Sequence, residues 1–110
     1  MSKTVTYTSD KWGGSVTFHD PLTLEQEAAW ESAILASKAL GSDVGLAEQQ
    51  VKIIPGILAC VERWELKDFP ERITLANWPT RPRLERAKLI AWLVKNISDL
   101  YEDSVTVPNS

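Results

Sequence analysis

RPRLERAKLIAWLVKNISDLY, residues 81–101, is the stretch whose pattern most strongly indicates how this chain folds. Large apolar side chains recur at helical spacing on one side of it, and others widen that stripe: Ile90, Val94, Ile97 and Tyr101, with Leu89, Leu93 and Leu100. Pro82 suits the start of such a helix, because proline lacks the N–H that a first turn leaves unpaired. A stripe this wide has to be covered by the rest of the domain or by a partner, and the sequence leaves both alternatives open.

The composition is that of one folded domain. A chain of 110 residues is long enough for one core, so we expect residues 1–110 to form a single domain. The hydrophobic fraction of 44% and the charged fraction of 25% disfavour a disordered chain. The net charge of −3 argues against a nucleic-acid partner, since such binding relies on neutralising phosphates. Five tryptophans are many for this length, and tryptophan is favoured in interfaces as well as in cores.

The number of cysteines and the length of the apolar segments indicate the cellular compartment. Cys60 is the sole cysteine, which excludes an internal disulfide, and its apolar neighbours predict a small buried side chain. No segment has the length of a membrane span, and the N-terminus lacks the apolar core of a signal peptide. We therefore expect no membrane partner and a reduced, cytoplasmic setting.

The N-terminal residues predict two strands. Residues 3–8 and 15–18 alternate β-branched or aromatic side chains with polar ones, and Gly13-Gly14 lies between them. We predict a β-hairpin over residues 3–18. Trp12 falls at its tip, where a large side chain is hard to bury in a small domain, so it is a candidate interface anchor; packing onto the first helix is the alternative.

Residues 24–102 are predicted to form a helical body. Thr23 and Gln26 have the spacing of a capping box before a helix over 24–39, which Gly41 is placed to end. The fold class predicted is mainly α: a small helical domain of three to four helices with an N-terminal β-hairpin.

A second helical region is predicted over residues 46–64, where most of the helix circumference is apolar. Pro55-Gly56 interrupts it, so we expect either a kink or two helices. Three prolines between residues 70 and 82 keep the following connection from forming a long helix.

The residue types needed for catalysis or metal binding are scarce. One histidine and one cysteine cannot build a common zinc site, and neither a phosphate-binding P-loop nor a Gly-x-Ser-x-Gly elbow is present. His19-Asp20 is typical of a turn, and acidic pairs such as Glu27 with Glu31 are typical of solvated helix faces. We therefore expect no enzymatic activity, no metal and no cofactor.

A basic cluster marks the start of the last helix. Runs of charge are mostly solvated helix faces, which is the first interpretation of this cluster. Positive charge at a helix N-terminus opposes the helix dipole, and this local cost adds some weight to a binding role as the alternative. Together with the wide apolar stripe, this cluster defines the candidate protein interface: Trp12, Arg83, Arg86, Leu89, Trp92, Leu93 and Leu100.

Several short phrases, in order, resemble a known kind of protein. These are DPLTL at 20–24, IIPGI at 53–57, VERW at 61–64, FP at 69–70, and the Pro79-x-x-Pro82 spacing leading into LIAWL at 89–93. Over residues 15–103 this layout resembles small proteins from the tail-gene regions of long-tailed bacteriophages and prophages. In size and helical character it is most similar to tail assembly chaperones.

The resemblance implies a non-enzymatic protein that works without a cofactor in the host cytoplasm. Tail assembly chaperones tend to form homo-oligomers, bind the aggregation-prone tape measure protein, and help the tail tube polymerise around it. The family offers no residue motif to transfer, so the interface residues above rest on the physical argument alone. Two alternatives stay open: a structural virion protein, such as a tail or capsid accessory subunit, and an inhibitor of a host defence protein.

Overall fold

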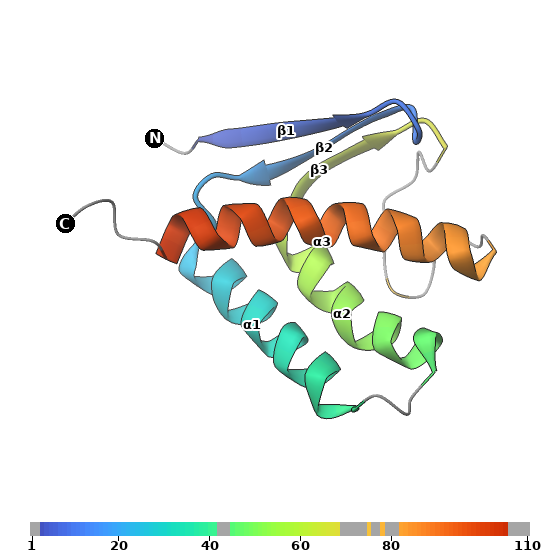
Figure 1. The fold of residues 1–110 in the computed structure, drawn as a ribbon. Coiled ribbons are helices and arrows are strands. Elements are labelled where there is room, and N and C mark those ends of the chain that lie inside the picture. Colours follow the sequence, from blue (N-terminus) through green and yellow to red (C-terminus); the bar gives the residue numbers. More distant parts are fainter. Residues whose placement is uncertain (1–2, 42–44, 69–74, 76–77, 79–81, 106–110) are drawn as a thin grey trace.

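The fold combines three helices with a three-stranded antiparallel sheet (Figure 1). The computed structural model describes residues 3–41, 45–68, 75, 78 and 82–105. Its elements are β1 (Thr4–Ser9), β2 (Gly14–His19), α1 (Leu24–Ala39), α2 (Leu46–Cys60), β3 (Val61–Leu66) and α3 (Arg83–Val105). In Figure 1, α3 crosses the molecule between the strands and the α1–α2 pair. The prediction of a mainly α fold therefore holds only in part, because the sheet has a third strand.

The predicted β-hairpin is confirmed. β1 and β2 pair antiparallel, with Val5 opposite Phe18 and Tyr7 opposite Val16. Gly13 takes a φ of 72°, a conformation that side chains with a Cβ rarely adopt. The alternation places the larger apolar side chains on one face of the sheet, and Val16 and Phe18 are fully buried there.

The end predicted for the second helical region is wrong. α2 ends at Cys60, and Val61–Leu66 forms β3, which pairs antiparallel with β2. The sequence predicts a helix over residues 61–64 because the apolar side chains there also fit helical spacing. β2 needs a second neighbour for its backbone groups, and pairing brings Trp64 opposite Val16 on the apolar face of the sheet. Tertiary pairing therefore overrides the local helical pattern.

Helix α1 matches its predicted range of 24–39. The capping box is present: the Gln26 N–H donates to Thr23 Oγ1 at 3.2 Å, and the Thr23 N–H donates to Gln26 Oε1 at 3.0 Å. After the helix, Gly41 takes a φ of 80°, which ends it as expected.

Helix α2 runs unbroken through Pro55, so the structure has one helix here and not two. Pro55 is exposed, which leaves the missing N–H on the solvent side of the helix. The next residue, Gly56, is buried against α1, where a Cβ atom would lie only 2.5 Å from the Cβ of Ala33. Gly56 thus lets α1 and α2 pack closely.

The core draws side chains from the sheet and all three helices. The apolar stripe of α3 belongs to it, with Leu93 and Ile97 fully buried. The two alternatives left open for this stripe are therefore decided in favour of the core along most of its length. Of the proline-containing connection before α3, only Leu75, Trp78 and Pro82 are described; Trp78 is buried and lies edge-on to Trp64, with ring centroids 6.1 Å apart.

Candidate functional site

Four of the predicted interface residues are buried within a single chain: Trp12, Leu89, Leu93 and Leu100. The structure therefore corrects their role from interface anchor to core. For the three leucines the physical reason is that the sheet and the α1–α2 pair together cover a stripe that looked too wide for so small a domain.

Trp12 is 5% exposed although it lies at the hairpin tip. The tip docks on the chain just after β3, where the Lys67 N–H donates to the Gly13 carbonyl at 3.1 Å and the Asp68 N–H donates to the Trp12 carbonyl at 3.4 Å. The Lys11 Nζ atom lies 5.0 Å from the centre of the Trp12 ring. The third strand, absent from the prediction, is what makes this burial possible.

The remaining predicted interface residues lie partly at the surface or outside the description. Trp92 is half-buried and packs against the core, and Arg86 is half-buried with an unpaired Nε atom among the described residues. The side chain of Arg83 lies outside the part that the structure describes. The structure therefore does not assemble the seven residues into one surface.

A different surface emerges from the packing of α1 and α3, a groove of about 410 Å³ that we call the α1–α3 groove. Its walls are mainly apolar and come from the middle of α1 and the C-terminal part of α3: Trp30, Ile34, Leu35 and Tyr101, with Glu31, Ser98 and Glu102 beside them. Trp30 is buried, whereas Leu35 is 67% exposed. The groove therefore offers solvent-facing apolar surface that the core does not use.

The rim of the groove is acidic. The Tyr101 hydroxyl donates a hydrogen bond to the Glu31 carboxylate, which joins the two walls. That hydrogen bond raises the pKa of Tyr101, and partial burial and the charges of Glu31 and Glu27 raise it further. Glu31 and Glu102 therefore place negative charge beside the apolar walls of the groove.

The sequence contains only a weak indication of the α1–α3 groove. Leu35 lies on the same side of α1 as Glu31, four residues earlier, whereas the buried side of the helix carries Trp30 and Ala33. A leucine displaced from the buried side indicates exposed apolar surface, but the opposing wall from α3 can be found only in the folded chain.

The described residues hold no evident reactive centre. Burial raises the pKa of the Cys60 thiol to about 12, so the thiolate needed for nucleophilic attack is scarce at neutral pH. Within the described ranges, His, Cys, Asp and Glu form no group of three that could bind a metal ion. In the same ranges, no helix combines the length and the apolar character needed to span a membrane.

Comparison with known proteins finds no family model, curated protein or solved structure that matches the chain. The function therefore has to be inferred from the surface of the molecule.

Proposed function

We propose that this protein is a non-enzymatic assembly factor that holds an apolar segment of a partner protein in the α1–α3 groove. The observation that carries the proposal is the exposed leucine, Leu35, beside a groove of about 410 Å³ whose base is the buried Trp30. A concave surface with a buried aromatic base and exposed apolar edges is typical of helix-in-groove recognition.

The charges of the groove specify the partner further. Glu31 and Glu102 border apolar walls, so the complementary segment is an amphipathic helix with lysine or arginine beside its apolar face. Such a segment is aggregation-prone when exposed, and covering it is the task of a holding chaperone. In the absence of a partner, a second copy of the chain could shield the groove, which would give a homo-oligomer.

The specific form that we propose is a bacteriophage tail assembly chaperone acting on the tape measure protein or the tail tube in the host cytoplasm. Its support is the resemblance of residues 15–103 to small tail-region proteins, together with the groove. The alternative is a structural virion protein, and one observation favours it: β1 is an edge strand, to which a neighbouring subunit could add a strand.

Co-expression with the tape measure protein of the same phage genome tests the proposal. Wild-type protein should keep the tape measure protein soluble, and Leu35→Glu should abolish this effect because it places charge on the apolar wall. The matched control is Leu84→Glu, since Leu84 is 73% exposed and lies about 25 Å from Tyr101 along α3.

Three outcomes would contradict the proposal or redirect it. A tape measure protein that stays insoluble with wild-type protein would refute the chaperone role. Equal loss of solubility with Leu35→Glu and Leu84→Glu would refute the groove as the binding site. Recovery of the protein as a stoichiometric part of purified particles would favour the structural virion protein instead.

A further inference from the structure

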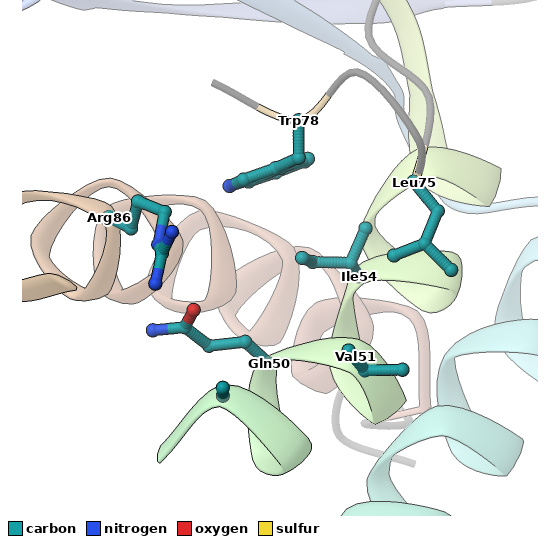
Figure 2. Close-up of a pocket in the computed structure, with 7 residues that line it drawn as sticks. Gln50, Val51, Ile54, Leu75, Trp78 and Arg86 are labelled. Atoms are coloured by element: carbon teal, nitrogen blue, oxygen red, sulfur yellow. The ribbon is translucent and has the colours of Figure 1, made fainter. Parts of the chain in front are cut away.

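A second cavity, separate from the α1–α3 groove, opens between α2 and the start of α3 with a volume of about 220 Å³. Figure 2 shows the side chains around it, which come from α2, from the segment before α3 and from α3 itself: Gln50, Val51, Ile54, Leu75, Trp78 and Arg86. Its two walls differ in chemistry, since one is apolar and the other carries nitrogen atoms.

Within the described residues, the polar wall carries three unpaired hydrogen-bond donors together with the amide oxygen of Gln50, which is an acceptor. Gln50 is 6% exposed and Trp78 is 8% exposed, and neither the Gln50 Nε2 atom nor the Trp78 Nε1 atom has a partner among the described residues. The buried Nε atom of Arg86 is also unpaired there. In Figure 2 the Arg86 guanidinium lies between the indole nitrogen of Trp78 and the amide of Gln50.

Unpaired donors of this kind indicate what the cavity is suited to hold. Buried donors in folded proteins are nearly always paired, because an unpaired one loses its hydration without compensation. The indole and the guanidinium can only donate, so the missing partner has to be an acceptor. Because Arg86 carries a permanent positive charge, an anionic acceptor fits better than a neutral one.

The apolar wall limits the ligand further. The apolar wall is made of Val51, Ile54 and Leu75, which suit the hydrocarbon part of a ligand. No acidic side chain lines the cavity among the described residues. One cation and two neutral donors match the single charge and two oxygens of a carboxylate, which arginine binds through two parallel hydrogen bonds. A doubly charged phosphate would leave charge uncompensated against hydrocarbon.

We propose that this cavity binds a monocarboxylate attached to a short aliphatic group. Benzene fills an apolar cavity of about 150 Å³, so a volume of about 220 Å³ accommodates about eight or nine non-hydrogen atoms. Two sources present this chemistry: a free branched or straight-chain acid, and the C-terminal residue of a peptide that ends in a leucine-like side chain.

This site is independent of the proposed function. The cavity uses α2 and the first turns of α3, whereas the α1–α3 groove uses α1 and the C-terminal part of α3, and the two sets of lining residues do not overlap. Failure of carboxylate binding would therefore leave the chaperone proposal intact, and the reverse also holds.

Nuclear magnetic resonance of the tryptophan indole groups tests the site directly. The full chain is titrated separately with 4-methylpentanoate, N-acetyl-leucine and, as the uncharged comparison, N-acetyl-leucine amide. The Trp78 indole resonance, assigned with Trp78→Phe, should shift with saturation on addition of either acid, and the amide should bind at least tenfold more weakly. Tighter binding of N-acetyl-leucine assigns the source as a peptide C-terminus, and tighter binding of 4-methylpentanoate assigns a free acid.

Variants separate a specific site from a general effect of charge. Arg86→Gln should weaken binding of the acids by about tenfold to a hundredfold, the range expected for a hydrogen bond to a charged group. Arg63→Gln is the matched control, because the Arg63 side chain is 71% exposed on β3, and it should bind as the wild type does. Gln50→Met, which keeps an unbranched side chain of similar length but removes the donor, should also weaken binding while the chain remains folded. No shift of the Trp78 indole at millimolar acid, equal binding of the amide, or unchanged binding by Arg86→Gln would overturn the proposal.

Discussion

Gly56 in α2 faces Ala33 in α1 so closely that a Cβ atom on Gly56 would lie 2.5 Å from the Cβ of Ala33. The same added atom would lie 3.3 Å from the ring of Trp30, which forms the base of the α1–α3 groove. The absence of a side chain at one position in α2 therefore sets both the spacing of two helices and the position of a groove wall.

We expect Gly56→Ala to destabilise the fold by about 1–3 kcal/mol, as overpacking of a tight core does. At an open helix position the same substitution would instead stabilise the fold by about 0.5–1 kcal/mol. The sign of the change in the free energy of unfolding therefore distinguishes a tight contact from an open position. Urea unfolding of both proteins measures it. Adding Ala33→Gly to the Gly56→Ala protein should recover part of the loss, and a single variant as stable as the wild type would contradict this close contact.

Removing the N-cap of α1 should be costly in a predictable way. Thr23→Ala deletes the acceptor for the Gln26 N–H, and loss of such a cap costs about 1 kcal/mol. For a domain of this size we expect the melting temperature to fall by about 4–8 °C. Ser32→Ala, at an exposed position in the same helix, is the control and should leave the melting temperature nearly unchanged or slightly raised. An equal fall in both variants would show that the cap is not the cause.

The Cys60 thiol should be almost inert in the folded protein. Because burial raises its pKa to about 12, alkylation at pH 8 should be at least about a thousandfold slower than that of a free cysteine, whose pKa is about 8.5. Iodoacetamide labelling followed by mass spectrometry measures the rate. Labelling at the rate of the urea-unfolded chain would contradict the burial.

The same thiol gives stability a pH dependence with a definite sign. In the unfolded chain Cys60 loses its proton near the ordinary thiol pKa of about 8.5, whereas in the folded chain it keeps the proton until about pH 12. The folded state therefore binds more protons in this window, and the free energy of unfolding falls as the pH rises through it. Cys60→Ala should lack this component, so its stability deficit relative to the wild type should shrink between pH 8 and pH 10. A deficit that stays constant would contradict the raised pKa.

Tyr101 should ionise at a higher pH than an ordinary tyrosine. Its hydrogen bond to Glu31 and the negative charges around it stabilise the protonated phenol, so its pKa is raised above 10. Absorbance titration of the phenolate, with Tyr101→Phe to assign the signal, measures this value. Glu31→Gln should lower the pKa of Tyr101 because it removes the charge and weakens the acceptor. A Tyr101 pKa that does not respond to this substitution would show that the two groove walls are not joined by this contact.

Sequence patterns identified much of the fold where neighbouring residues decide the structure. The capping residues Thr23 and Gln26 located the start of α1, and the glycines after β1 located the hairpin turn. In both cases the deciding hydrogen bonds or backbone angles involve residues within a few positions of each other. The candidate site was less accessible, because the groove exists only where Leu35 and Tyr101, far apart in the chain, lie on facing walls.

Gly14 has a structural role that the prediction of a hairpin does not include. The sequence places Gly14 between the two strands of the predicted hairpin, and the structure gives the reason for glycine: a Cβ atom would lie 1.9 Å from the Glu65 carbonyl oxygen. β3 passes so close that no side chain fits. Since β3 was not predicted, this constraint could not be derived from the hairpin alone.

The sequence by itself determined one small domain with an N-terminal hairpin, a capped helix over 24–39 and a long amphipathic helix near its C-terminus, because these follow from local backbone preferences and side-chain periodicity. Only the tertiary structure decided that Val61–Leu66 is a strand, that Trp12 and the leucines of α3 are buried, and that the available apolar surface lies beside Leu35. The physical reason is that pairing with a distant strand and burial against distant helices outweigh local preference. Neither the free energy of strand pairing nor that of burial can be derived from a window of adjacent residues.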